Sequence, residues 1–350
     1  MTSPIGNRIH TISKPWLIAV LFALLWPAGV TSAADLPAGG QWFRGTFIQL
    51  TNQHEDWPRA KWNLFFDYLR QLKISEIVLQ WTVYQDRAFY GGPAEGTAKI
   101  RPVDTILDLA DENDMQVWVG LVYDPQYWSK IKQKPDLVAA YLRGLFLRSA
   151  AAARELRPVL KNHPCFQGWY IPEEIADVTW REPGAREVLV MHLKDLEQLL
   201  HGLTPQKKVA LSGFTNGTTS PFKFQAFWNA VLSSSRVDRF LFQDGIGAHK
   251  LELDYLALYL APLRQIVEDH ELEFQVIVEI FSQVAGYPVN DRPFHAVPAP
   301  LARIEKQVAL SGAYAANGLQ AFSIPDYMTP LAGTDAARLY FDYTRLGHTP

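Results

Sequence analysis

The sequence predicts an α/β fold, a single-domain (β/α)8 TIM barrel. Eight short runs rich in Val, Ile, Leu and Phe recur between residues 45 and 326, and amphipathic stretches of helical length separate them. Nearly continuous apolar runs are typical of parallel strands buried on both faces. No glycine-rich phosphate loop follows the first run, so a nucleotide-binding open sheet fits less well than a closed barrel.

The expected strands are residues 45–50, 76–83, 116–122, 168–174, 208–213, 239–247, 274–280 and 319–326. Prolines precede or open most of the helical stretches, because a residue without an N–H is tolerated in the first turn of a helix. These prolines are Pro58, Pro102, Pro135, Pro183, Pro221 and Pro300. Two further stretches, 251–270 and 336–346, bring the helices to eight.

The N-terminal segment predicts export. A basic start is followed by an uncharged apolar run from Trp16 to Trp26, and then by small residues up to Ala34. This order is that of a secretory signal peptide, and the apolar run is short for a membrane span. We expect a signal peptide over residues 1–34, cleaved after Ala33 or Ala34, and a periplasmic or secreted barrel domain over 35–350 with its core at about 43–346. An uncleaved membrane anchor is the alternative.

Composition excludes several classes of protein. The chain has 33 Lys and Arg against 36 Asp and Glu, a formal net charge of −3, so it has no basic excess for binding nucleic acid. Its one cysteine, Cys165, excludes an internal disulfide framework. After residue 40 no stretch predicts a membrane span, so we expect no stable membrane insertion once the signal is removed.

The functional residues of such a barrel lie at the C-terminal ends of its strands and in the loops that follow. Among the polar and aromatic side chains there, we expect a subset to bind a carbohydrate substrate, because aromatic faces and short polar groups suit sugar rings and hydroxyls. These candidates are Gln49, His54, Gln80, Trp81, Tyr84, Tyr123, Asp124, Trp128, Asn216, Gln243, Asp244, Asp326 and Tyr327.

Three glutamates stand out as candidate catalytic residues. Glu173 and Glu174 end the fourth apolar run, and Glu279 is the only charged residue in the seventh. A carboxylate on a buried strand is costly unless it is paired or functional. Two carboxyls that face one cleft suit glycosidic bond cleavage, with one as acid and the other as nucleophile or base. A separation of roughly 5–5.5 Å would predict retention of configuration, and roughly 6.5–9.5 Å inversion.

These residues resemble a known group of enzymes. GWYIPEE (168–174) and VIVEIF (276–281) are similar to the ends of strands 4 and 7 in clan A glycoside hydrolases. The resemblance implies that Glu174 is the acid/base and Glu279 the nucleophile. Glu173 stands where that clan has Asn, which leaves Glu173 as the alternative acid. Residues 43–330 also resemble a group of exported bacterial barrel proteins of unknown function, through GTF, WYIPEE and FQDGIG.

Two other functions stay open. The protein could be a catalytically inactive barrel that binds glycans or assists secretion. It could also be a metal-assisted hydrolase or deacetylase that uses Asp124, Asp244 and a histidine. The histidines show no His-x-x-x-His spacing, so we expect neither a metal nor a cofactor.

Overall fold

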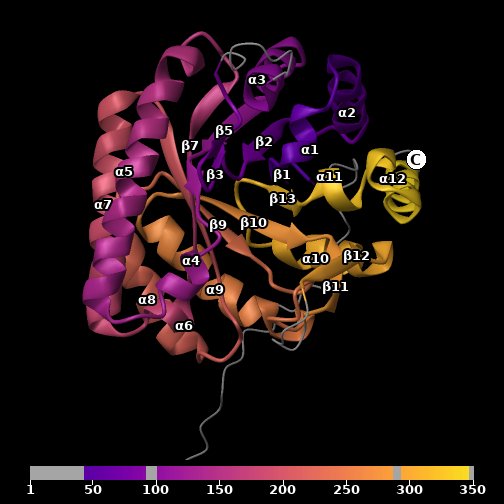
Figure 1. Cartoon of the computed structure of the whole chain (residues 1–350). Helices are drawn as coiled ribbons and strands as arrows, with labels where there is room; N and C mark the ends of the chain where they lie inside the picture. The colour runs from indigo at the N-terminus through magenta and orange to yellow at the C-terminus, as the bar shows by residue number, and fades with distance from the viewer. Residues whose placement is uncertain (1–42, 92–100, 287–292, 347–350) are drawn as a thin grey trace, which may run out of the picture. The chain divides into compact units, whose positions relative to one another are not determined.

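The computed structural model describes residues 43–91, 101–286 and 293–346, and in them the apolar runs pair in parallel as a closed barrel (Figure 1). The barrel strands are β1 (Gly45–Ile48), β2 (Glu76–Leu79), β5 (Gln116–Gly120), β7 (Phe166–Ala176), β8 (Lys208–Phe214), β9 (Arg239–Gln243), β10 (Glu273–Glu279) and β13 (Leu319–Phe322). Their order around the barrel is β1-β13-β10-β9-β8-β7-β5-β2. The predicted (β/α)8 fold is confirmed.

Eight longer helices lie outside the described strands (Figure 1). They are α2 (Arg59–Gln71), α3 (Pro102–Glu112), α5 (Pro135–Leu160), α7 (Pro183–Leu203), α8 (Pro221–Leu232), α9 (Leu253–Asp269), α10 (Leu301–Gly312) and α12 (Thr334–Leu346). Four of them begin with the proline that the sequence placed there, and Pro58 and Pro300 are the N-caps of α2 and α10. Their apolar faces pack on the outside of the barrel strands.

Along the described chain, short helices and two small sheets lie between the barrel strands and the longer helices. The short helices are α1 (Asn52–Glu55), α4 (Tyr127–Lys130), α6 (Asp177–Trp180), α11 (Ile324–Tyr327) and the 3-10 turn Pro330–Ala332. A small sheet joins β3 (Val83–Tyr84), β4 (Arg87–Ala88) and β6 (Val122–Tyr123). β11 (Phe281–Ala285) and β12 (His295–Pro298) pair in antiparallel fashion after β10.

Six of the expected strands end earlier in the structure, and three of them end four residues early. β9 ends at Gln243 because Asp244 begins a turn in which Gly245 has φ +68°. β13 ends at Phe322, and residues 324–327 form α11 instead. β2 ends at Leu79, and residues 83–84 pair in the small sheet. In each case an apolar residue, Val83, Ile246 or Ile324, continues the pattern after the backbone has left the barrel, so hydrophobicity alone overestimates the strand.

One side chain from each strand fills the barrel interior. This apolar layer consists of Phe47, Val78, Trp118, Tyr170, Ala210, Leu241 and Ile277, with Phe322 packed against it. Below it, Glu76 is fully buried and accepts two hydrogen bonds of 2.8 Å from Arg239, whose guanidinium lies 4.0 Å from the ring centre of Trp118. These side chains close the N-terminal end of the barrel, which leaves the C-terminal end for a binding site.

The predicted signal segment, residues 1–34, lies outside the described residues, so its cleavage and the export of the protein stay predictions. The described residues all belong to one compact unit, Leu36–Pro350. Within 43–91, 101–286 and 293–346, every helix is too short or too polar to cross a bilayer.

Candidate functional site

A cavity of about 420 Å³ lies at the C-terminal ends of the barrel strands. Its lining residues are Gln49, Gln80, Trp81, Tyr123, Glu174, Gln243, Ala248, Lys250, Ile277, Glu279, Phe281, Phe294, Phe322, Asp326 and Tyr327. The volume falls in the range of about 300–1,000 Å³ that is usual for small-molecule sites. The cavity brings Glu174 and Glu279 together, although their strands β7 and β10 are three apart in the barrel.

Strand alternation explains which polar residues reach this cavity. Successive side chains of a strand point to opposite faces, so residues two apart share a face. Glu174 follows the interior residues of β7, and Glu279 comes two residues after Ile277 of the apolar layer. Other members of this polar layer likewise come two residues after an interior side chain, and they are Gln49, Gln80 and Gln243.

Glu279 is held by the loop that follows β9. Its side chain is 4% exposed, and its Oε2 accepts a 2.7 Å hydrogen bond from the main-chain N–H of Ala248. Burial raises the pKa of Glu279, whereas the charge of Lys250 and the N–H groups of Ala248 and Gly247 favour its ionised form. A side chain at Gly247 would not fit, because a Cβ there would lie 2.4 Å from the Phe281 carbonyl oxygen. The FQDGIG segment therefore positions a carboxylate.

Asp244 stabilises the loop after β9 from the protein interior and does not line the cavity. It is fully buried, and its Oδ1 accepts hydrogen bonds of 3.2 Å from the main-chain N–H groups of both Ile246 and Glu279. Gln307 of α10 donates to its other oxygen. Burial and the neighbouring charge of Glu279 raise the pKa of Asp244 to about 7. The prediction that Asp244 binds sugar hydroxyls is corrected, because its oxygens are used within the protein.

Glu174 has a different environment from Glu279. It is partly exposed to the cavity, and its Oε1 accepts a 3.2 Å hydrogen bond from the amide of Gln80. Gln80 in turn accepts a 2.8 Å bond from Gln49. Burial raises the pKa of Glu174, the charge of Lys250 and a hydrogen bond from Gln243 lower it, and the charge of Glu279 raises it. Each carboxylate therefore lies within the electrostatic reach of the other.

Glu173 lies on the opposite face of β7, outside the barrel interior. It is 3% exposed, and its Oε1 lies 3.2 Å from Nε2 of His192 on α7. The strand carries Pro172, which has no N–H to donate, at a register shift between Ile171 and Ile175. The alternative that Glu173 is the acid is therefore corrected, since its carboxyl packs between the barrel and the helices and does not line the cavity.

Lys250 was not predicted from the sequence. Its Nζ lies 3.5 Å from the ring centre of Phe214, and its charge lowers the pKa of both Glu174 and Glu279. It follows a loop in which Gly245 and His249 have positive φ angles of 68° and 55°. A loop of this conformation leaves no hydrophobic pattern in the sequence. The presence of a single lysine soon after a strand end could still have indicated a charged residue near the site.

Aromatic side chains form two walls of the cavity. On one side Trp81 stacks on Tyr123, with ring centres 4.7 Å apart, and Tyr84 stacks on Tyr123 at 5.7 Å. On the other side Tyr327 packs on Phe281, with ring centres 5.3 Å apart. Of the predicted aromatic residues, the cavity thus contains Trp81, Tyr123 and Tyr327.

Besides Asp244, five predicted binding residues lie outside the lining of this cavity. Asp124 forms a 2.8 Å ion pair with Arg148. Trp128 packs on Phe214, with ring centres 5.6 Å apart. Asn216 lines a separate hollow beside α9. His54 lines a second, larger hollow of about 1250 Å³ together with Tyr84.

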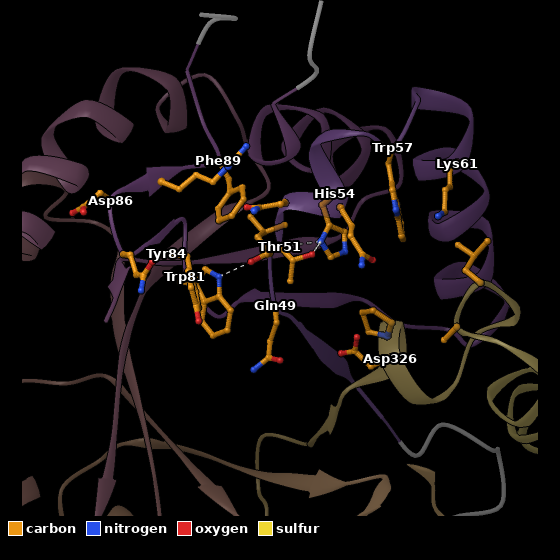
Figure 2. Close-up of a pocket in the computed structure, with 18 residues that line it drawn as sticks. Gln49, Thr51, His54, Trp57, Lys61, Trp81, Tyr84, Asp86, Phe89 and Asp326 are labelled. Atoms are coloured by element: carbon orange, nitrogen blue, oxygen red, sulfur yellow. Dashed lines mark hydrogen bonds between the residues drawn. The ribbon is translucent and has the colours of Figure 1, made fainter. Parts of the chain in front are cut away.

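The second hollow adjoins the cavity and shares three lining residues with it, Gln49, Trp81 and Asp326. Figure 2 shows Trp81 and Tyr84 at one end of this hollow and Trp57 and Lys61 at the other. The two spaces therefore lie side by side along one groove over the ends of β1 and β2.

Among the described residues, one group of three side chains has the spacing of metal ligands: Asp111, His163 and Cys165. His163 Nδ1 lies 2.6 Å from Asp111 Oδ2, and the main-chain N–H of Cys165 donates to Asp111 Oδ1 at 2.7 Å. Burial raises the pKa of the Cys165 thiol, which disfavours the thiolate that a metal would need. The group precedes β7, at the other end of the barrel from the two glutamates. The structure does not bring Asp124 and Asp244 into a metal-ligand cluster.

Comparison with known proteins places the chain in a family. A model of a domain of unknown function, DUF4434, matches residues 43–333. An uncharacterized protein of Escherichia coli K12, YbcH, is 27% identical over 266 residues, which cover 76% of this chain and 84% of YbcH.

Solved structures with a similar fold are named for glycoside hydrolysis. A candidate α-L-fucosidase from Bacteroides thetaiotaomicron has a TM-score of 0.73 at 18% identity, over 93% of this chain and 99% of its own. A β-galactosidase from Marinomonas ef1 has a TM-score of 0.55 at 12% identity, over 87% of this chain and 58% of its own. At these identities the likeness shows a shared barrel fold.

Proposed function

Because the chain belongs to the DUF4434 family, whose function is unknown, we propose its activity from the site: it is a glycoside hydrolase that cleaves a polysaccharide with two carboxylates. The observation that carries this proposal is that Glu174 and Glu279, from strands three apart, line one cavity with aromatic walls. Glycosidic bond cleavage requires two carboxyl groups that flank the bond.

Glu279 is the nucleophile. Burial raises the pKa of Glu279, and the charge of Lys250 and the N–H groups of Ala248 and Gly247 oppose this rise and favour the ionised form. An ionised carboxylate held by main-chain donors keeps a fixed position, as attack on an anomeric carbon requires. Its oxygen forms an ester to that carbon as the bond to the leaving oxygen breaks, and water later cleaves the ester.

Glu174 is the general acid and base. Burial and the charge of Glu279 raise its pKa, which favours the protonated form that must donate to the leaving oxygen. Once Glu279 has formed its ester, its negative charge is gone, and the pKa of Glu174 falls. Glu174 can then accept a proton from the attacking water, so that the same pair serves both steps.

The substrate is a glycan outside the cytoplasm. The signal segment over residues 1–34 favours export, and the groove beside the cavity favours a chain of sugars over a single one. Gln49, Gln80 and Gln243 offer amides to sugar hydroxyls, and Trp81 and Tyr327 offer ring faces.

The test is release of reducing ends from a panel of bacterial exopolysaccharides by the wild type, E174Q, E279Q and a control, E187Q. Glu187 is exposed on α7, so the control keeps the charge change without touching the cavity. We expect release by the wild type and E187Q and at least about a hundredfold less by the other two. Binding without release by the wild type would support the inactive barrel, and loss of release with a chelator would support the metal-assisted hydrolase.

A further inference from the structure

The second hollow contains a cation that is held without an acidic partner. The Nζ of Lys61, on α2, lies 4.0 Å from the ring centre of Trp57, and Lys61 forms no ion pair with any residue in the described part of the chain. Trp57 is fixed in turn by Trp62, with ring centres 4.7 Å apart. A cation over an aromatic face keeps its charge and its N–H donors for a ligand.

The acidic groups around this hollow have interactions with residues other than Lys61. Glu55 accepts hydrogen bonds from Arg87 and Arg101. Asp86 lies 3.8 Å from Arg148. Asp326 accepts a hydrogen bond from the hydroxyl of Ser323, and burial raises the pKa of Asp326, which favours its neutral form. Lys61 is therefore the charge in the hollow that these neighbours leave uncompensated.

His54 adds a neutral donor beside Lys61. Its Nδ1 accepts a 3.0 Å hydrogen bond from the main-chain N–H of Thr51, so in the neutral ring the proton is on Nε2. Burial, with a smaller contribution from the charge of Lys61, lowers the pKa of His54 to about 4, which keeps the ring neutral at pH 7. The His54 ring centre lies 4.8 Å from that of Trp57, so the donor and the cation share one end of the hollow (Figure 2).

We propose that this end of the groove is a subsite for a sugar unit with an anionic substituent, bound by the ammonium of Lys61 and Nε2–H of His54. The proposal rests on the proposed function, because it takes the polysaccharide chain to run from the cavity, past Gln49 and Asp326, to this subsite. The substrate is then an acidic polysaccharide that carries carboxylate or sulfate groups.

The test is calorimetric binding to full-length E279Q, which needs no turnover. The anionic probes are tetramers of glucuronate, galacturonate and mannuronate. Each is compared with the neutral tetramer made by reducing its carboxyl groups, and with the sulfated form of that neutral tetramer. We expect at least one anionic tetramer to bind about tenfold or more tightly than its neutral partner, since a hydrogen bond to a charged group contributes that much. If only the uronate tetramers bind more tightly, the subsite is specific for a carboxylate. If the sulfated tetramers also bind more tightly, the subsite recognises negative charge in general.

Variants in the E279Q background assign the effect to Lys61. K61A should remove the advantage of the anionic tetramer, K61R should retain part of it, and K306A, at an exposed lysine of α10, should change nothing. Equal binding of every anionic tetramer and its neutral partner, or an advantage that survives K61A, would overturn the subsite. Cleavage of an acidic glycan that is equally fast in the wild type and K61A would overturn the subsite alone, whereas Lys61-dependent binding with no cleavage by the wild type would overturn the hydrolase alone.

Discussion

The main-chain N–H of Ala248 donates to Oε2 of Glu279 at 2.7 Å, so the loop after one barrel strand fixes the carboxylate at the end of the next. Asp244 accepts N–H donors from both segments and ties them together. The position of the nucleophile thus depends on the main chain of a loop, and this dependence can be tested.

The first prediction concerns the close approach at Gly247. In G247A the added Cβ would lie 2.4 Å from the Phe281 carbonyl oxygen and 2.8 Å from Glu279 Cβ, so the loop must move. We expect a loss of about 1–3 kcal/mol in the free energy of unfolding, as is usual for overpacking, and a lower kcat for glycan cleavage. Urea denaturation and initial rates measure the two effects.

The matched control for this variant is G144A, on an exposed position of α5. A Cβ at Gly144 meets no atom within 4 Å, and alanine is the better helix former by about 1 kcal/mol. G144A should therefore be as active as the wild type and at least as stable. Equal stability and activity of G247A and the wild type would show that the loop does not hold Glu279.

The second prediction separates the two adjacent glutamates. In E173Q the amide can still bond His192, and the cavity is untouched, so kcat/KM should stay within roughly threefold of the wild type. In E174Q the acid is lost, and kcat should fall by about 10²- to 10⁴-fold. Steady-state kinetics on the same glycan compare them. A larger loss in E173Q than in E174Q would restore Glu173 as the acid.

The third prediction concerns the charge of Lys250. Because this charge lowers the pKa of both glutamates, K250M should raise both pKa values and move the whole pH profile of kcat/KM to higher pH. K250R keeps the charge and should leave the profile in place. Carbon-13 NMR of the glutamate carboxyls follows the same titrations without substrate. Identical titration curves for the wild type and K250M would contradict the account.

The fourth prediction is a pH dependence of stability that comes from Asp244. Its pKa is about 7 in the fold against about 3.9 in the unfolded chain, so its contribution is fully present below about pH 4 and is lost as the pH rises to 7. In D244N this contribution no longer titrates. Gln307 can bond the new amide by turning its side chain, because its Oε1 is buried without a hydrogen-bond partner.

Urea denaturation of both proteins at pH 4, 5.5, 7.5 and 8.5 checks this. The free energy of unfolding of the wild type relative to D244N should fall across the series and then stay level above pH 7. A difference that stays constant from pH 4 to 7.5 would show that Asp244 is ionised throughout.

Much of the fold followed from the sequence, because parallel strands buried on both faces leave a strong apolar signal. The same signal misplaced the strand end at residues 244–247, because the apolar Ile246 follows the strand although the backbone turns at Gly245. Because successive side chains of a strand face opposite sides, knowing that Tyr170 points into the barrel would have been enough to predict that Glu174, and not Glu173, faces the interior. The position of Lys250 depends on positive φ angles in its loop, which leave no period in the sequence.

Azide rescue tests the central claim most directly, on an aryl glycoside of the sugar that the exopolysaccharide panel identifies. With Glu174→Ala, azide takes the place of the water that attacks the Glu279 ester. With Glu279→Ala, azide attacks the anomeric carbon itself. The account predicts that azide restores turnover in both, with a glycosyl azide of retained configuration from E174A and of inverted configuration from E279A. No rescue of either variant, or the same configuration from both, would contradict the assignment of the two carboxylates.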